Sequence, residues 1–273
     1  MSAEREFLER LEAMGAKLAA RAPSAAAEFA KAEPFPHVVL DGFFDETVLD
    51  RVLEEFPGPK GVDWIEYDDP HQRKLATKHA SQIKPLTRAF INFLNSAEFM
   101  DFVEQVSGIQ GLIPDPHLDG GGLHQIPAGG KLGIHTDFLM QARLKLDRRL
   151  NLILYLNRDW KEEWGGHLEF WRDRTSGPAK RVLPAFNRMV IFATTAYSFH
   201  GHPDPLACPP DRFRRSVALY YYSNGRPAEE RSNVRHTRFI LRPGERARWK
   251  VRQFLRRLVP PILNDLRYLG KRD

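Results

Sequence analysis

Apolar residues recur at helical spacing along the first part of the chain. The first apolar stripe lies among alanines and charged residues, which predicts an amphipathic helix that ends before Pro23. The members of this stripe are Phe7, Leu8, Leu11, Met14 and Leu18. A second stripe follows Asp45, whose carboxylate can cap a helix, and this helix is predicted to stop at Pro57.

Two more helices and one strand are predicted in the same part of the chain. Residues 85–94 and 97–106 have helical patterns, and Ser96 can cap the second of them. Residues 35–44 are predicted to form a strand. Residues 61–81 are polar and lack a clear period, so we expect them to be irregular.

From about Leu112 the pattern changes to short β-rich runs separated by turn residues, which predicts a sandwich or barrel. The clearest runs are residues 150–156, 167–171, 189–193 and 216–222. We therefore expect one α+β domain, with a helical support region at 1–110, a β-rich core at 111–225 and a basic extension at 226–273. Within this extension, residues 245–269 regain helical character.

Composition limits the class of protein further. The chain has 273 residues, 42% of them hydrophobic, which is enough for one well-filled core. A single cysteine, Cys208, cannot form an internal disulfide, and we find no pattern typical of a secretory signal. No apolar run is long enough to predict a membrane-spanning helix, so we expect a protein that works reduced, in the cytoplasm.

Positive charge is concentrated towards the C-terminal end. Residues 226–273 hold 14 Lys/Arg against 5 Asp/Glu, a surplus of 9, so the rest of the chain carries −3 of the net +6. This distribution suggests contact of the basic extension with an anionic surface or, more simply, a solvated helix face. Nucleic acid is not expected as a partner of the protein as a whole.

The sequence His135-Thr136-Asp137 places two side chains that can bind a metal two residues apart. In a strand such residues face the same side, so both can reach one ion. His200 follows 63 residues later, at the end of a strand-like run, and completes two histidines and one carboxylate, the facial triad of non-haem iron(II) sites. His202 competes with His200 for the third position.

Arg214 begins an alternating run in which Ser216 and Ala218 share its face. One cation at the end of a pocket floored by small side chains would suit a distal carboxylate, because a guanidinium can bind both carboxylate oxygens. Arg215 is the alternative, and the small residues in step with Arg214 favour Arg214.

Several segments together resemble the prolyl 4-hydroxylase-like branch of the 2-oxoglutarate and iron(II) dependent oxygenases. They are residues 133–137 (Gly-Ile-His-Thr-Asp), 155–160 (Tyr-Leu-Asn-Arg-Asp-Trp) and 165–168 (Gly-Gly-His-Leu), Phe192 eight residues before His200, and the strand of Arg214. The resemblance covers roughly residues 123–222 and, more loosely, residues 35–56. It implies a double-stranded β-helix, a jelly-roll or cupin-like core, between N-terminal and C-terminal helices.

The resemblance also implies roles for individual residues. His135, Asp137 and His200 would bind iron(II), Arg214 would bind the C5 carboxylate of 2-oxoglutarate, and the hydroxyl of Tyr155 would assist that carboxylate. The cofactors implied are iron(II), 2-oxoglutarate and O2, with ascorbate as a possible addition. The reaction implied is hydroxylation of an unactivated C–H bond, with release of succinate and CO2.

Other polar residues near these motifs have less defined roles. Gln125 stands where relatives often carry a tyrosine near the cosubstrate, so we treat it as a cofactor-pocket residue of uncertain role. His124 and His167 are interpreted as ordinary pocket or core histidines. The pair Gly165-Gly166 is interpreted as a tight turn between strands.

The substrate class stays open between peptidyl-proline, amino acids and small metabolites. Residues 140–149 and 61–81 are candidates to cover the pocket entrance. The first of these segments carries four basic residues, which favours an acidic or phosphorylated substrate: Arg143, Lys145, Arg148 and Arg149. Two rival hypotheses are a cupin-like metal enzyme that does not use 2-oxoglutarate and a non-catalytic adaptor that binds anionic surfaces through the basic extension.

Overall fold

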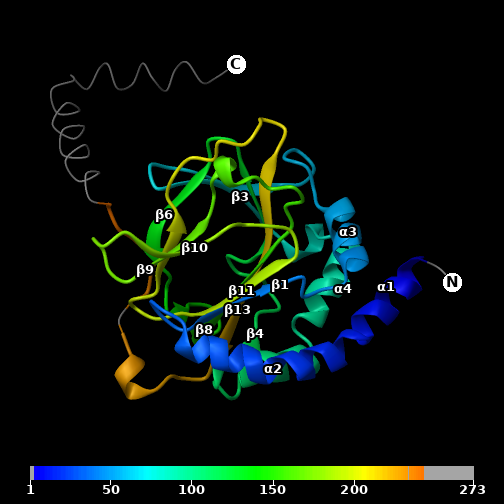
Figure 1. The fold of residues 1–273 in the computed structure, drawn as a ribbon, viewed down its shortest axis with the longest axis horizontal. Coiled ribbons are helices and arrows are strands. Elements are labelled where there is room, and N and C mark those ends of the chain that lie inside the picture. Colours follow the sequence, from blue (N-terminus) through cyan, green and yellow to red (C-terminus); the bar gives the residue numbers. More distant parts are fainter. Residues whose placement is uncertain (1–2, 233, 243–273) are drawn as a thin grey trace.

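The computed structural model describes residues 3–232 and 234–242 and places helices around a large curled sheet (Figure 1). The α-helices described are α1 (Ala3–Glu12), α2 (Met14–Lys31), α3 (Glu46–Glu55), α4 (Pro85–Phe93) and α5 (Ala97–Ser107). The strands described are β1 (His37–Asp41), β2 (Trp64–Asp68), β3 (Gln72–Thr77), β4 (Ile113–Pro114), β5 (Gly122–Pro127), β6 (Lys131–Thr136), β7 (Met140–Gln141), β8 (Leu146–Tyr155), β9 (Leu168–Trp171), β10 (Pro178–Val182), β11 (Arg188–Ala193), β12 (Phe199–His202), β13 (Phe213–Ser223) and β14 (Arg238–Phe239). The predicted helix at residues 245–269 and most of the basic extension lie outside the described residues.

The sheet has the strand order β1-β11-β8-β13-β5-β3-β6-β12-β9-β10, and the pairings along this path are antiparallel. It curls so that the two ends of the strand order face each other. Leu168 and Phe170 of β9 pack against Val190 and Phe192 of β11, and this buried cluster joins the two layers. The chain therefore has the predicted double-stranded β-helix core.

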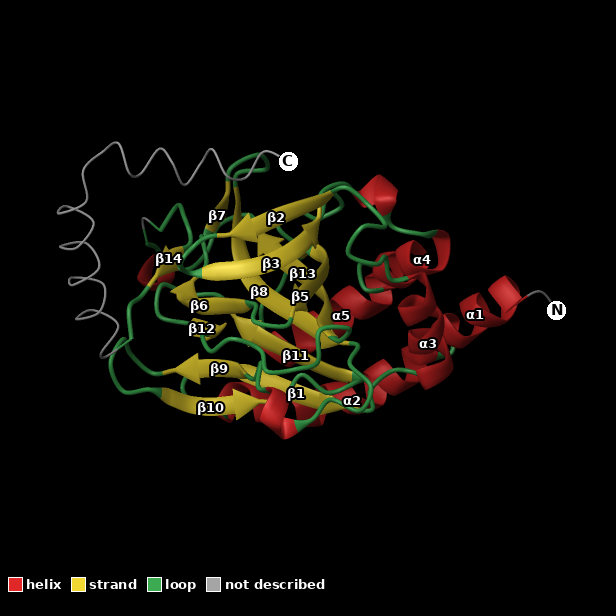
Figure 2. Ribbon diagram, turned by 90° about the horizontal axis from the view of Figure 1, so that it is seen from above, coloured by secondary structure: helices red, strands yellow, loops and turns green. Residues whose placement is uncertain are grey.

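The helices gather on one side of the sheet, as Figure 2 shows. The main hydrophobic core lies between them and the outward-facing residues of the central strands, among them Leu152 and Val217. Tyr221 is fully buried in this core, where its hydroxyl donates a hydrogen bond to the carbonyl oxygen of Leu94 at 2.9 Å. One face of the central strands thus packs on helices, and the opposite face is left to line a pocket.

Two predicted helix caps are confirmed. The Asp45 carboxylate accepts hydrogen bonds from the backbone N–H groups of Thr47 and Val48, and α3 ends before Pro57. The Ser96 hydroxyl accepts a hydrogen bond from the N–H of Phe99 at the start of α5. These caps satisfy donors that have no partner inside a helix.

The first predicted helix corresponds to two helices, α1 and α2, and the prediction that it ends before Pro23 is wrong. Helix α2 continues through Pro23 to Lys31. A proline inside a helix removes one backbone hydrogen bond, but here the buried stripe goes on beyond it with Ala25 and Phe29. Because this stripe packs on α5, tertiary contacts hold the helix together where local propensity would end it.

The prediction that residues 61–81 are irregular is also wrong. The segment forms the hairpin of β2 and β3, and β3 joins the sheet by pairing with both β5 and β6. Asp69 closes the turn, because its carboxylate accepts hydrogen bonds from the N–H groups of His71 and Gln72. The region at 1–110 therefore contributes strands to the sheet as well as helices.

Candidate metal and cosubstrate site

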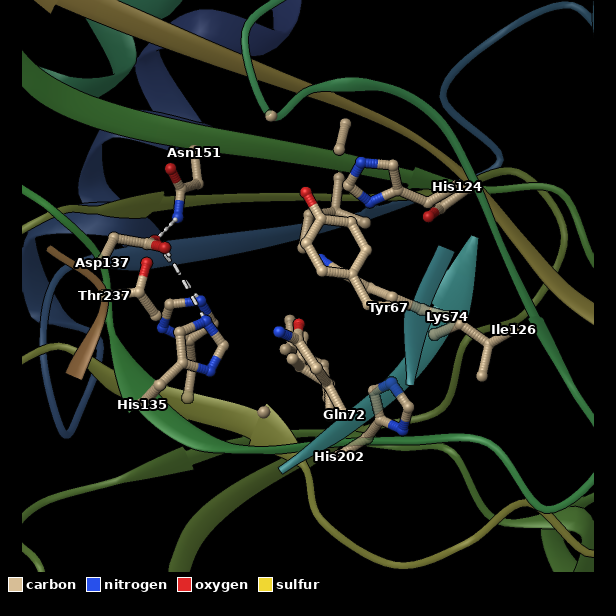
Figure 3. Close-up of a pocket in the computed structure, with 18 of the residues that line it drawn as sticks. Tyr67, Gln72, Lys74, His124, Ile126, His135, Asp137, Asn151, His202 and Thr237 are labelled. Carbon is tan, nitrogen blue, oxygen red and sulfur yellow. Dashed lines mark hydrogen bonds and ion pairs between the residues drawn. The ribbon is translucent and has the colours of Figure 1, made fainter. Parts of the chain in front are cut away.

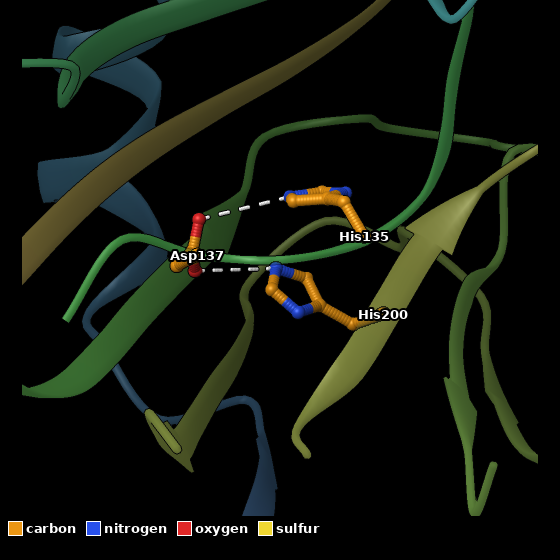
Figure 4. A group of neighbouring side chains, drawn as sticks. All are labelled: His135, Asp137 and His200. Carbon is orange, nitrogen blue, oxygen red and sulfur yellow. Dashed lines mark ion pairs between the residues drawn. The ribbon is translucent and has the colours of Figure 1, made fainter. Parts of the chain in front are cut away.

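Three side chains that can bind a metal meet at the junction of β6 and β12. His135 lies in β6, Asp137 follows that strand, and His200 pairs with His135 across the two strands. Their nearest ligand atoms all lie within 4.8 Å of one another, and all three residues are buried (Figure 4). His202, the rival of His200, is not part of this cluster.

Backbone carbonyl groups fix the orientation of both imidazoles. The Nδ1 atom of His135 lies 2.8 Å from the carbonyl oxygen of Gly133, and that of His200 lies 3.0 Å from the carbonyl oxygen of Ser198. The Nε2 atoms therefore face Asp137, at 3.7 Å for His135 and 3.5 Å for His200. A proton on Nδ1 leaves each Nε2 lone pair free, which is the arrangement that metal-binding histidines require.

The Asp137 carboxylate is oriented by two donors on β8. Its Oδ2 atom accepts a hydrogen bond from Asn151 at 2.7 Å (Figure 3). The same oxygen forms an ion pair with the Arg148 guanidinium at 3.1 Å. Burial acts to raise the pKa of Asp137, but the Arg148 guanidinium and the two neighbouring imidazoles hold that pKa below its usual range. The carboxylate is therefore anionic at neutral pH, and its Oδ1 atom remains available to a cation.

Both imidazoles are neutral at neutral pH. Burial lowers the pKa of His135 to about 3, with a further contribution from the neighbouring His200, and burial also lowers the pKa of His200. Neutral imidazole nitrogens and one carboxylate oxygen suit a divalent metal such as iron(II). The donor set of this chain thus fits the ion that the motif predicts.

The sequence suggested that Arg148 belongs to a basic segment at the pocket entrance, but the structure places it elsewhere. Residues 140–149 contain β7 and the start of β8, and of their four basic residues only Arg143 and Lys145 are exposed. Arg148 is buried, and its guanidinium lies 3.4 Å from the centroid of the Tyr220 ring. Arg149 is buried too and pairs with Glu230. The argument for an acidic substrate from this segment therefore fails.

Arg214 lies in the same pocket as the three candidate metal ligands. Ser216 and Ala218 share its face of β13, as expected. Its Nε atom donates to the carbonyl oxygen of Gly166 at 2.8 Å, and one terminal nitrogen donates to the Tyr155 hydroxyl at 3.1 Å. Arg214 is 5% exposed, and the other terminal nitrogen of its guanidinium has no hydrogen-bond partner in the part of the chain that the structure describes. This side chain is thus held in place and can still bind an anion.

Arg215, the alternative to Arg214, points away from the pocket. Its guanidinium lies 5.3 Å from the ring centroid of Phe56, and its backbone N–H donates to Asn157. The alternation of β13 separates the two arginines onto opposite faces.

Gly166 does more than form a turn. Its φ is +74°, and a Cβ atom placed there would lie 2.5 Å from Leu206 Cδ2 and 3.1 Å from Arg214 Cδ. Only a glycine allows the backbone to approach Arg214 closely enough for its carbonyl oxygen to accept the Nε hydrogen bond. The pattern Gly165-Gly166 signalled a turn, but its contact with Arg214 could not be read from the sequence.

The prediction that Gln125 lines the cofactor pocket is wrong. The pocket is lined by its neighbours in β5, His124 and Ile126, while Gln125 is fully buried on the opposite face. Within the described residues its side-chain amide has no hydrogen-bond partner. Alternation along β5 explains the difference, since adjacent residues of a strand face opposite sides.

The other histidines take different places. His124 and His202 line the pocket, and burial lowers the pKa of both, to about 3 for His124, so both are neutral. Neither ring nitrogen of His202 has a partner among the described residues. His167 is a buried residue outside the pocket lining, and its Nε2 lies 2.8 Å from Glu162.

The hairpin of β2 and β3 lies in the segment 61–81, which was expected to cover the pocket entrance. It supplies three pocket residues that the sequence did not single out: Tyr67, Gln72 and Lys74. In Figure 3 they lie on the side of the pocket opposite Asp137 and His135. An Asp-Asp-Pro turn signal was present at residues 68–70 and could have identified the hairpin, although its strands lack a clear hydrophobic alternation.

Comparison with known proteins agrees with this geometry. Residues 121–222 match the model of the 2OG-Fe(II) oxygenase superfamily. The prolyl 3-hydroxylase OGFOD1 of Mus musculus is 24% identical over 196 residues, which cover 70% of this chain. The chain spans about a third of that relative, since the match covers 33% of it.

Solved structures are similar in fold. One from a study of prolyl 4-hydroxylases from Phytophthora capsici has a TM-score of 0.50 and 18% identity, and the match covers 78% of this chain and 65% of that one. A Pseudomonas putida prolyl-4-hydroxylase has a TM-score of 0.49 and 16% identity, over 74% of this chain and 98% of that one. No helix among the described residues is long and apolar enough to cross a membrane.

Proposed function

We propose that this chain is a 2-oxoglutarate-dependent hydroxylase of the 2OG-Fe(II) oxygenase superfamily and that it binds iron(II) through His135, Asp137 and His200. Arg214 would bind the distal carboxylate of 2-oxoglutarate, and the Tyr155 hydroxyl would assist it. Both sets of side chains line or adjoin one pocket, and this juxtaposition carries the proposal. A ligand with a chelating end and a carboxylate at the other end can engage both.

Iron(II), 2-oxoglutarate and O2 together supply the oxidising power for hydroxylation of a C–H bond, with succinate and CO2 as co-products. The chain supplies the geometry. Asn151 and Arg148 hold one oxygen of Asp137, so the carboxylate presents the other oxygen to the metal. The ring of Phe192, 4.7 Å from that of His200, provides an apolar wall beside the ligands.

The substrate that we propose is a prolyl residue of a peptide. Support comes from the relative in Mus musculus, which is named a prolyl 3-hydroxylase, and from the fold shared with a structure from work on prolyl 4-hydroxylases. Free amino acids and small metabolites are the competing substrates. They are distinguished by incubating the iron-loaded enzyme with each class and measuring succinate and the hydroxylated product.

The test of the cofactor site is an anaerobic titration of the iron(II)-loaded protein with 2-oxoglutarate, followed by the visible charge-transfer band of the chelate. We expect a band in the wild type, no band in His135→Ala, and a band that needs far more 2-oxoglutarate in Arg214→Ala. Arg215→Ala is the matched control, because that side chain lies on the other face of β13. It should titrate like the wild type.

Absence of the band in protein that holds one iron(II) per chain would contradict the proposal. Turnover of a substrate without 2-oxoglutarate would instead favour the cupin-like metal enzyme. Equal titrations of Arg214→Ala and the wild type would show that another residue binds the distal carboxylate.

A further inference from the structure

We propose that Lys74, with Tyr67 beside it, forms a subsite for a carboxylate or another singly charged anionic group of the substrate. This inference rests on the proposed function, in which Arg214 binds 2-oxoglutarate. It assigns a role to Lys74, the pocket cation that the proposed function leaves without a partner. The sequence suggested an acidic substrate because residues 140–149 are basic, and the burial of Arg148 removed that argument. Lys74 gives an independent reason to expect an anionic group in the substrate.

Lys74 stands in β3 directly opposite Tyr67 in β2. Its Nζ atom lies 4.9 Å from the centroid of the Tyr67 ring, and both side chains line the pocket (Figure 3). Among the described residues the amine has no hydrogen bond and no ion pair. Side chains with a charge are seldom left this way in a pocket wall unless a ligand completes them.

The charge of the pocket supports an anionic ligand in addition to 2-oxoglutarate. Its lining holds three cations, Lys74, Arg148 and Arg214, and one carboxylate, Asp137. Asp137 and Arg148 form a buried ion pair and cancel. Iron(II) and the 2-oxoglutarate dianion together add no net charge. The loaded pocket therefore keeps a positive charge, and Arg214 has its partner in the cosubstrate while Lys74 has none.

Position favours the substrate over the cosubstrate as the partner of Lys74. Arg214 is buried and fixed by Gly166 and Tyr155, as suits a ligand that binds first and lies deep. Lys74 and Tyr67 keep part of their surface exposed, whereas Arg214 is buried, so a ligand can reach them from the entrance. A substrate that enters after 2-oxoglutarate would meet Lys74 before it reached the metal ligands.

Desolvation in the pocket lowers the pKa of Lys74 to about 8. The Asp137 carboxylate acts to raise this pKa, and the Arg148 and Arg214 guanidinium groups act to lower it. A bound anion would offset this desolvation and stabilise the charged amine. Because a hydrogen bond to a charged group is stronger than a neutral one, we expect Lys74 to make an anionic ligand bind roughly tenfold more tightly.

The experiment measures ligand binding to the iron(II) and 2-oxoglutarate complex without O2, by calorimetry at pH 7. Two matched pairs of probes differ only in charge: N-acetylproline and N-acetylprolinamide, and the amidated dipeptides acetyl-Asp-Pro and acetyl-Asn-Pro. We expect at least one anionic probe to bind the wild type about tenfold more tightly than its neutral partner. In Lys74→Met this preference should disappear, and in Lys74→Arg most of it should remain.

Lys78→Met is the matched control, since Lys78 follows the same strand but is exposed and pairs with Asp63. It should keep the charge preference of the wild type. A wild type that shows no charge preference for either pair, including one that binds no probe, would overturn the proposal. So would a preference that survives in Lys74→Met.

A third result separates this inference from the proposed function. If Lys74→Met weakens 2-oxoglutarate about tenfold and leaves the probe preference unchanged, Lys74 serves the cosubstrate and the inference is wrong while the proposed function stands. If the wild type forms no complex with 2-oxoglutarate, the proposed function fails before any probe is added.

Discussion

Replacement of Gly166 by alanine should weaken 2-oxoglutarate binding without touching a metal ligand. The added Cβ would lie 2.5 Å from Leu206 Cδ2, 3.1 Å from Arg214 Cδ and 3.4 Å from Arg214 Nε. Leu206 can move aside at its flexible end. Arg214 can move only by giving up the 2.8 Å hydrogen bond to the Gly166 carbonyl or the 3.1 Å bond to Tyr155.

Two contributions set the expected loss of stability. A non-glycine residue with φ of +74° is destabilised by about 1–2 kcal/mol, and overpacking adds about 1–3 kcal/mol. The melting temperature of a chain of this size falls by roughly 2–4 °C per kcal/mol, so a decrease on the order of 10 °C is expected. Loss of one charge-assisted hydrogen bond to the cosubstrate would weaken 2-oxoglutarate by about 10–100-fold.

Gly165→Ala is the control that isolates the contact with Arg214. Gly165 also has a positive φ, +67°, but a Cβ atom there would meet nothing within 4 Å. This variant should lose stability through backbone strain and bind 2-oxoglutarate like the wild type. Thermal denaturation and anaerobic 2-oxoglutarate titration measure the two effects separately. If Gly166→Ala binds 2-oxoglutarate as tightly as Gly165→Ala does, the carbonyl of Gly166 does not position Arg214.

Three further predictions follow from other contacts. Asn151→Ala removes the 2.7 Å bond to Asp137 and should lower iron(II) affinity by about 10–100-fold in a metal titration, and unchanged affinity would contradict the role of Asn151. Tyr221→Phe leaves the buried carbonyl of Leu94 without its donor, so urea denaturation should show a loss of about 1–3 kcal/mol with normal 2-oxoglutarate binding. The charge preference that we assign to Lys74 should be present below pH 8 and decline as the pH rises through and above about 8, because the free amine loses its proton there, and a preference that persists to pH 10.5 would contradict this. The lowered pKa also affects stability. Between pH 8 and about 10.5 the unfolded chain still holds the Lys74 proton and the folded chain does not, so the free energy of unfolding contributed by Lys74 rises with pH in this range.

The three candidate metal ligands could be predicted from the sequence because the arrangement of two of them is local. In an extended chain, His135 and Asp137 face the same side whatever the rest of the fold does. His200 needed one long-range pairing, of β12 with β6, which sets it opposite His135. The choice of Arg214 over Arg215 had the same local basis, since Ser216 and Ala218 marked the pocket face of β13.

The place of Gln125 could not be fixed in this way. It was located by counting ten residues back from His135, across the turn that joins β5 to β6. The face that a residue shows after a turn depends on the register of the two strands, and a change of one residue reverses it. That register is set here by the pairing of β5 with β3 and β13, which are distant in the sequence, and it gives the pocket to His124 and Ile126.

The hairpin of β2 and β3 was missed because the residues that line its pocket face are polar. Hydrophobic alternation identifies a strand only when one of its faces packs in an apolar core. Tyr67, Gln72 and Lys74 face a cavity that holds charged groups, so the side that would be apolar in a core strand carries hydrogen-bonding groups instead. The polar residues that hid the strand from a hydrophobic pattern are therefore the residues that give it its proposed role at the site, since an anion would stabilise an inward-facing lysine that has no partner.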